Sequence, residues 1–263
     1  MAITTLDGLI GAARQRIQMA KTATRTSAAA IPFSVFDIAG NPGAGTLAGT
    51  STTTGTVPTD ATAGCPTINA FGGSNTGYIS RVEANNTVSC RIQLYDLLWK
   101  GGAYAFNAAT SGNTPTSYSS RLPNTDYTQL ELWYEQVTAG TGIQSVNVTY
   151  NNESAVSHST GVTSIGVAGI VGKMFQLPLQ AGDKGIQGVT GVAGTVATAG
   201  TFNILVMRPL MDARIRVAND GQVFDALGVG LPQIYADSAL IMIVTADSTS
   251  TGLPELIVDV SNG

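Results

Sequence analysis

The stretch that decides the fold reads Tyr127-Thr-Gln-Leu-Glu-Leu-Trp-Tyr-Glu-Gln-Val-Thr138, Ala139-Gly-Thr-Gly142, Ile143-Gln-Ser-Val-Asn-Val-Thr-Tyr150. Both outer segments alternate side chains with a period of two, which is the pattern of a half-buried β-strand. In the first segment leucine and tyrosine occupy one face, while Glu131, Trp133 and Glu135 share the other. The Gly-rich break between the segments predicts a turn, so we expect a β-hairpin here.

Working outward, similar strand-like segments recur along the chain about every 8 to 15 residues, and no βαβ rhythm accompanies them. We therefore predict a mainly β protein whose body, residues 77–263, is an antiparallel β-sandwich or jelly-roll-like fold. The further strand candidates are Ile31–Ile38, Tyr78–Glu83, Thr87–Leu94, Val162–Val171, Met174–Leu179, Thr201–Pro209, Ala213–Ala218, Leu240–Ala246 and Leu256–Val260.

Two local features refine the predicted body. Asn85-Asn86 separates the candidate strands Tyr78–Glu83 and Thr87–Leu94, so we expect a second hairpin at that point. Asp96–Trp99 precedes Gly101-Gly102 and is predicted to be a short helical turn.

Residues 1–36 are predicted to form an N-terminal arm, helical at first and then extended. From Thr5 to Lys21 the apolar side chains follow the i, i+3, i+4, i+7 spacing of one helical stripe. Thr4 or Thr5 can cap the helix, and Asp7 lies in its first turn. We expect the arm to bind a partner through two sets of side chains, the apolar Leu6, Leu9, Ile10 and Ile17 and the basic Arg14, Arg16, Lys21 and Arg25.

The charge distribution supports an arm that differs from the body. Charged residues are only 11% of the chain, against about a quarter in typical globular proteins. Residues 1–36 carry four basic residues and one acidic residue, whereas the remaining residues carry nine basic and sixteen acidic residues. A basic arm on an acidic body is typical of self-assembly or of docking on an acidic partner, although a solvated helix face has the same pattern. The net charge of −4 makes nucleic-acid binding unfavourable.

Residues 37–76 are predicted to be a Gly- and Thr-rich linker and loop. Its first part, Ala39–Gly49, has the glycine spacing of a Walker A motif, but Thr46 stands where the phosphate-binding lysine would be. A sharp turn is therefore the better interpretation. We expect a hinge between arm and body, formed by Gly40, Pro42, Gly43 and Gly45.

Candidate catalytic and metal-binding residues are few, and we expect no enzyme, cofactor, metal site or small-molecule substrate. His158 is the one histidine, and no Gly-x-Ser-x-Gly motif provides it with a nucleophile. Glu131 and Glu135 lie too far apart along a strand for glycosidase chemistry and are interpreted as rim charges beside Trp133. Cys65 and Cys90 are expected to be free, buried thiols.

Targeting signals are also weak. The first ten residues lack a basic region followed by an apolar one, so we expect no signal peptide and synthesis in a cytoplasm. The apolar stretch Ala239–Val244 is too short to span a bilayer, so no membrane association is expected.

Four blocks carry a family resemblance, namely Asp37–Ala48, Leu177–Asp183, Thr201–Leu210 and Ala236–Leu240 together with Asp247–Glu255. With these blocks the chain resembles the structural proteins encoded among the head genes of tailed bacteriophages, and it is similar in character to capsid decoration (cement) proteins. The resemblance implies a virion protein without catalytic residues, on the outer capsid surface, which binds the major capsid protein and copies of itself, often as a trimer.

Three functions thus remain open at this stage. The first is a decoration protein whose arm reaches over a neighbour. The second is a tail-associated, glycan-binding module that would use exposed aromatic side chains such as Trp99, Tyr104, Tyr118 and Trp133. The third is the capsid lattice subunit, which the absence of a long predicted helix after residue 36 disfavours.

Overall fold

The computed structural model describes residues 3–73, 75–107, 111–167, 169–194 and 199–263. The described residues form three antiparallel sheets, two short α-helices and two 3₁₀ turns. The helical elements are α1 (Leu6–Gly11), α2 (Ala226–Val229), η1 (Ser119–Arg121) and η2 (Pro123–Thr125).

The sheets differ in strand order. The first sheet, ordered β15-β5-β18-β1-β3 with β16 beside β5, comprises β1 (Ala13–Lys21), β3 (Gly40–Asn41), β5 (Gly77–Asn86), β15 (Asp220–Phe224), β16 (Gln233–Ile234) and β18 (Glu255–Asn262). The middle sheet, ordered β12-β8-β14-β6-β17-β2 with β4 beside β6, comprises β2 (Pro32–Ser34), β4 (Ser51–Thr56), β6 (Cys90–Ala105), β8 (Glu131–Thr138), β12 (Met174–Leu177), β14 (Thr201–Ile215) and β17 (Leu240–Ala246). The third sheet, ordered β10-β9-β13-β7 with β11 beside β9, comprises β7 (Ser111–Gly112), β9 (Ile143–Asn152), β10 (Ser157–Ser159), β11 (Thr163–Val167) and β13 (Ile186–Gly194).

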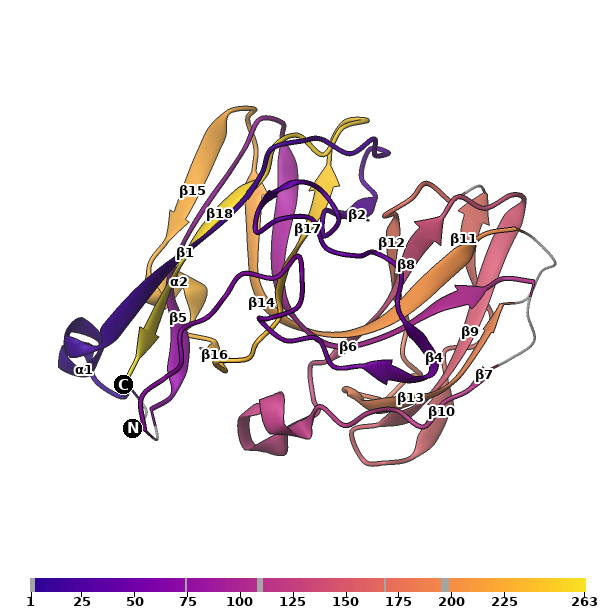
Figure 1. The fold of residues 1–263 in the computed structure, drawn as a ribbon, viewed down its shortest axis with the longest axis horizontal. Helices are drawn as coiled ribbons and strands as arrows, with labels where there is room; N and C mark the ends of the chain where they lie inside the picture. The colour runs from indigo at the N-terminus through magenta and orange to yellow at the C-terminus, as the bar shows by residue number, and fades with distance from the viewer. Residues whose placement is uncertain (1–2, 74, 108–110, 168, 195–198) are drawn as a thin grey trace.

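The middle sheet is shared by two sandwiches. Its longest strands, β6 and β14, pair with each other and bend as they run from the first sheet to the third (Figure 1). The first core lies between one half of the middle sheet and the first sheet, and it includes Ile92, Leu94 and Val258. The second core lies between the other half and the third sheet, and it is richer in aromatic side chains such as Tyr134 and Phe202.

The inner side of the curled middle sheet is covered as well. A third cluster of buried side chains, the inner core, includes Phe36, Leu97, Trp133 and Leu205. The segment between β3 and β5, which includes β4, crosses this side (Figure 1). The middle sheet is therefore buried on both faces, a condition in which strands need apolar side chains on both sides.

The mainly β class and the antiparallel sheets are confirmed, while the sheet orders do not confirm a jelly roll. Both predicted hairpins are wrong. Residues 139–142 join β8 to β9, which belong to the middle and third sheets, and Asn86 ends β5 in the first sheet before β6 begins in the middle sheet. In each case the apolar faces of the two strands pack against each other across a core.

The predicted helix from Thr5 to Lys21 is also wrong in extent. Thr5 caps a helix as expected, accepting a hydrogen bond from the Gly8 amide at 3.0 Å, but the helix ends at Gly11. Residues Ala13–Lys21 form β1, which pairs with β18 along its length. The alternation of buried Ile17 and Met19 with exposed neighbours satisfies a strand, and pairing with β18 outweighs the helical spacing. The predicted arm thus contributes an interior strand of the first sheet.

The segment Asp96–Trp99 is not a helical turn, because it lies inside the sixteen-residue strand β6. Its side chains are buried on both faces, so their spacing carried no period-two signal. No helix among the described residues is long and apolar enough to cross a membrane.

Candidate functional site

The N-terminal segment is where the sequence predicted a partner-binding surface. Leu6 and Ile10 on α1 are 71% and 64% exposed, Leu9 is half-buried, and α1 has no buried residue. A six-residue helix is too short to be stable by itself in water. The apolar side of α1 is therefore uncovered in the single chain.

The other predicted arm residues contact their own chain. Ile17 is buried in the first core. The Arg16 guanidinium donates to Asp259 at 2.9 Å, the Lys21 ammonium donates to the Ile38 carbonyl at 3.1 Å, and Arg25 pairs with Asp37. Arg14 and Arg16 are both exposed, and Arg14 reaches the Leu9 carbonyl at 3.4 Å. The structure thus separates the eight predicted residues into an exposed α1 group and a group that anchors β1 and the chain after it.

The predicted hinge glycines occupy different environments. A Cβ atom on Gly40 would lie 2.1 Å from the Ala20 carbonyl oxygen, and one on Gly45 would lie 2.4 Å from the Phe36 ring. A Cβ atom on Gly43 would meet nothing within 4 Å. Gly40 also pairs with Lys21 in the first sheet, next to Asn41 and Pro42. Close packing therefore requires two of these glycines, and Gly43 is the one with free space.

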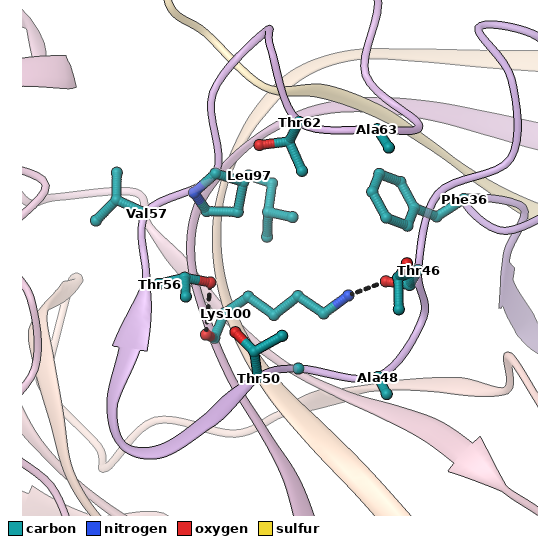
Figure 2. A pocket seen from close by; sticks show the side chains of 12 residues that line it. Phe36, Thr46, Ala48, Thr50, Thr56, Val57, Thr62, Ala63, Leu97 and Lys100 are labelled. Atoms are coloured by element: carbon teal, nitrogen blue, oxygen red, sulfur yellow. Dashed lines mark hydrogen bonds between the residues drawn. The ribbon is translucent and has the colours of Figure 1, made fainter.

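The pocket shown in Figure 2 lies under the predicted linker loop, on the inner side of the middle sheet. Its volume is about 260 Å³, and its lining residues include Phe36, Gly49, Leu97 and Lys100. The Lys100 side chain extends along the floor toward Thr46, to whose carbonyl oxygen it donates at 3.0 Å (Figure 2). Its ammonium nitrogen lies 5.0 Å from the centre of the Phe36 ring, a cation–π distance.

Lys100 belongs to a buried group of three polar side chains on adjacent strands, which we call the Lys100 cluster. Lys100 on β6 is 6% exposed, Glu135 on β8 is 2% exposed, and Asn203 on β14 is fully buried. The Lys100 ammonium lies 4.0 Å from Glu135 Oε2, and the Asn203 amide nitrogen donates to the same oxygen at 2.7 Å. The cluster brings together an amine, a carboxylate and a carboxamide in a largely apolar site.

The interpretation of Glu131 and Glu135 as rim charges is corrected accordingly. Glu131 does lie beside Trp133, whose indole N–H donates to it at 2.8 Å, and Tyr95 donates to the same oxygen at 2.9 Å. Glu135 is buried, and the segment between β3 and β5 lies over it, since the Asn203 amide that donates to Glu135 also donates to the Leu47 carbonyl. The sequence showed that the two glutamates share a face, but it contained no sign that this face is covered.

A second buried ionic group, the Asp96 cluster, lies on the same strand β6. Asp96 is fully buried and pairs with Arg121 and with Arg208, the latter at 3.3 Å. Its carboxylate also accepts hydrogen bonds from the Ser238 hydroxyl at 2.9 Å and the Ala239 amide at 3.1 Å. Sequence analysis missed this group, since its members lie far apart along the chain.

His158 lies on β10, at the edge of the third sheet. Its Nδ1 atom is 2.8 Å from the Asp183 carboxylate, which also accepts from Tyr150 and Asn152 at 2.6 and 2.8 Å. Burial would raise the pKa of Asp183, but the hydrogen bonds from these three residues outweigh it and lower that pKa. Burial and the bond to Asp183 raise the pKa of Tyr150 to about 12. These hydrogen bonds join the loop at Asp183 to Tyr150 and Asn152 on β9 and to His158 on β10.

Other predicted residues can be placed briefly. Cys65 and Cys90 are free and buried, as expected, and burial raises the pKa of Cys65 to about 12. Trp99, Tyr104, Tyr118 and Trp133 are all buried, so the aromatic surface that a glycan-binding module would need is not formed by them. Within the described part of the chain no group of three or more His, Cys, Asp or Glu side chains could hold a metal ion.

Comparison with known proteins gives no family. No protein-family model and no curated protein matches the chain. Among solved structures, infectious bursal disease virus (Gt strain) is 8% identical, with 95% of this chain and 81% of that chain covered and a TM-score of 0.17. The T=1 particle derived from infectious bursal virus is 7% identical, with 95% and 77% covered and a TM-score of 0.17. The KBV activated particle at acidic pH is 11% identical, with 84% and 76% covered and a TM-score of 0.13. These are distant likenesses to viral capsid structures and carry no argument about this chain.

Proposed function

We propose that this chain is a non-enzymatic structural protein of a bacteriophage virion, a decoration protein that binds the capsid surface and copies of itself. The observation that carries the proposal is the uncovered apolar side of α1, at the edge of a β-sandwich body. The described residues of the same chain leave the side chains of Leu6 and Ile10 mostly exposed to solvent. The low charge content and the resemblance of four sequence blocks to phage head proteins support the same function.

The proposed contact is narrower than the predicted arm. Residues 13–36 hold β1 and β2 in the body, so only the segment up to Ala12 is free to reach a neighbour. Leu6, Leu9 and Ile10 would dock on the adjacent capsid subunit, and Arg14 would face its acidic groups. Burying an apolar side chain contributes about 1.5 to 3 kcal/mol, whereas an exposed ion pair contributes less than about 1 kcal/mol, so the apolar contacts dominate. Repetition over a capsid lattice would strengthen such modest contacts.

The test is a binding measurement on shells of the encoding virus that lack this chain. Deletion of residues 1–36 would be uninformative, because it removes β1 from the first sheet. The informative change is Leu6→Ser with Ile10→Ser, which leaves every sheet intact. We expect saturable binding of the wild-type protein and a loss of affinity of at least about 100-fold in the double variant.

Val162→Ser is the matched control, because Val162 is 68% exposed and lies far from α1 in the third-sheet half of the molecule. It should bind like the wild-type protein. Unchanged occupancy of the Leu6/Ile10 variant would contradict docking through α1. Absence of saturable binding by the wild-type protein would contradict the decoration function itself.

A further inference from the structure

We propose that Lys100 and Asn203 become joined by an intramolecular isopeptide bond, with Glu135 carrying the protons. The strand order β8-β14-β6 places the three residues on neighbouring strands. Asn203 lies directly opposite Glu135, and Leu205, two residues further along β14, lies opposite Lys100. Lys100 is thus a diagonal neighbour of Asn203 on one face, within reach of a long side chain.

The surroundings favour reaction over a stable ion pair. Lys100, Glu135 and Asn203 are at most 6% exposed, and Phe36, Leu97 and Leu205 belong to the apolar inner core around them. The separation of 4.0 Å between the ammonium and the carboxylate is too long for a hydrogen bond. A buried pair of charges without close contact is costly, and transfer of one proton from Lys100 to Glu135 removes both charges.

The carboxamide of Asn203 is held at both ends. The Gly49 amide donates to Oδ1 at 2.9 Å, where negative charge would develop as the amine attacks. The Nδ2 atom donates to Glu135 Oε2 at 2.7 Å and to the Leu47 carbonyl at 2.6 Å. Gly102 leaves room for this group, since a Cβ atom there would lie 2.1 Å from Oδ1.

The reaction balances without an oxidant, a reductant or a second substrate. Glu135 accepts a proton from the Lys100 ammonium, and the neutral amine nitrogen forms a bond to Cγ of Asn203 while the carbonyl π electrons move to Oδ1. Protonated Glu135 gives its proton to Nδ2, and the Cγ–Nδ2 bond breaks with its electron pair leaving on ammonia. Glu135 then takes the second proton from Nζ, which leaves an amide, and passes it to ammonia. The net change is one ammonium ion released and one amide bond formed.

The pocket of Figure 2 provides what such a reaction needs beyond the three residues. Lys100, which would supply the amine, and Gly49, which donates to the carboxamide oxygen, both line it, so the departing ammonia would have a volume to enter beside Lys100. Because the amine and carboxamide are fixed on paired strands, the attack is intramolecular and needs no separate binding step. The link would join β6 to β14, the two strands that run through both sandwiches.

The experiment is mass spectrometry of the purified, denatured full-length chain. We expect the wild-type mass to be about 17 Da below the sequence mass, the loss of one ammonia. Trypsin should release the segments Ile92–Arg121 and Gly185–Arg214 as one linked species, because the bond blocks cleavage at Lys100 and trypsin does not cut between Arg208 and Pro209. A full wild-type mass would overturn the proposal, and so would a mass loss with Asn203 in a linear peptide, which indicates a succinimide.

Two glutamine substitutions test the role of Glu135. Glu135→Gln keeps the shape and the hydrogen bond to Asn203 but cannot carry a proton, so the chain should keep its full mass. Glu131→Gln is the matched control on the same strand and should show the same mass loss as the wild-type protein. Cross-linking in Glu135→Gln at the wild-type extent would overturn the assignment to Glu135. The readout is independent of capsid binding, so it fails or succeeds separately from the proposed function.

Discussion

Two buried ionic groups lie on the same strand, β6, and they are built in opposite ways. The Asp96 carboxylate is held by two guanidinium groups, a hydroxyl and a backbone amide. Four residues further along, the Lys100 ammonium has one carbonyl oxygen at 3.0 Å and a carboxylate only at 4.0 Å. The Asp96 carboxylate thus has four partners, whereas the Lys100 ammonium is only weakly paired with a carboxylate and lies near a carboxamide.

The difference in pairing suggests that the two buried charges have different roles, one in stability and one in a reaction. In the Asp96 cluster, Arg121 comes from η1 and Ser238 from the turn before β17, so the carboxylate ties two connections to the middle sheet. Such a group stabilises the fold only while all members are present. In the Lys100 cluster each residue instead has the chemistry to react with the next, and the pocket gives the product a way out. A buried charge with a full set of partners, such as the Asp96 carboxylate, stabilises the fold. A weakly paired buried charge, such as the Lys100 ammonium, is available for a reaction.

The largest expected effect on stability comes from removing the Asp96 carboxylate. Asp96→Ala leaves the Arg121 and Arg208 guanidinium groups buried without their carboxylate, so we expect a loss of about 3 to 5 kcal/mol in the free energy of unfolding. Urea denaturation followed by tryptophan fluorescence measures it. The control is Asp212→Ala at the surface pair with Arg91, whose side chains are 46% and 44% exposed. That change should cost less than about 1 kcal/mol, and equal losses at both sites would refute the contrast.

The next effect concerns the incompletely paired group. Lys100→Met keeps the side-chain volume and prevents the isopeptide bond, and we expect it to cost about 2 to 4 kcal/mol, the usual contribution of a cross-link that closes a long loop. In a chain that already carries Glu135→Gln, Lys100→Met should not cause this loss of stability, because the isopeptide bond is absent from that chain from the start. Urea unfolding of the two single variants and the double variant measures this coupling. Strictly additive losses would indicate that no bond links Lys100 to Asn203 in the wild-type protein.

The sequence predicted a part of this contrast. The period of two placed Glu131, Trp133 and Glu135 on one face of a strand, and the structure confirms it. Periodicity shows which residues share a face, but not what covers that face. Here residues 36–63 cover it, and their Gly- and Thr-rich sequence predicted only a loop. The burial of Glu135 therefore depends on a tertiary contact that has no local signal.

The same limit explains the two wrong hairpins and the wrong helix. A turn sequence such as Ala139-Gly-Thr-Gly142 predicts a change of direction but does not say whether the next strand pairs laterally or crosses to another sheet. At the N-terminus, Ile17 fits both a helical stripe and a strand, and only Met19 breaks the helical interpretation. Pairing with β18, which is more than 200 residues away in sequence, decides between them.

A smaller effect on stability is expected at Gly45, which packs against Phe36 in the wall of the pocket shown in Figure 2. Gly45→Ala would push a methyl group into the Phe36 ring and toward the Ala63 carbonyl, 2.4 and 2.6 Å away, so we expect a loss of about 1 to 3 kcal/mol in unfolding free energy. Gly43→Ala, two residues earlier, should change stability by less than about 0.5 kcal/mol because nothing lies near its Cβ position. Thermal unfolding compares the two.

The smallest effect is expected beside the edge strand β10, where a third carboxylate, Asp183, accepts hydrogen bonds from Asn152, Tyr150 and His158. Although burial opposes it, these bonds lower the pKa of Asp183 in the folded chain. A lowered folded pKa means that the stabilisation is complete above the ordinary carboxyl value of about 3.9 and is lost as the pH falls through the folded value. Wild-type protein should therefore exceed Asp183→Asn in unfolding free energy at pH 5 and lose this advantage as the pH falls through the folded pKa of Asp183. Because His158 is partly exposed and its charge is screened by water, the difference should stay below about 1 kcal/mol.

The comparison between wild type and variant isolates Asp183 from the other carboxylates that protonate over the same range. Asp7→Asn, at the exposed carboxylate of α1, is the control for replacing an acid by an amide. An advantage of the wild-type protein that persists unchanged as the pH falls through the folded pKa of Asp183 would show that the hydrogen bonds do not depend on the charge of Asp183. Asp183 would then stabilise the fold through packing and not through its charge. The comparison between fully and weakly paired buried charges would rest on the Asp96 and Lys100 clusters alone.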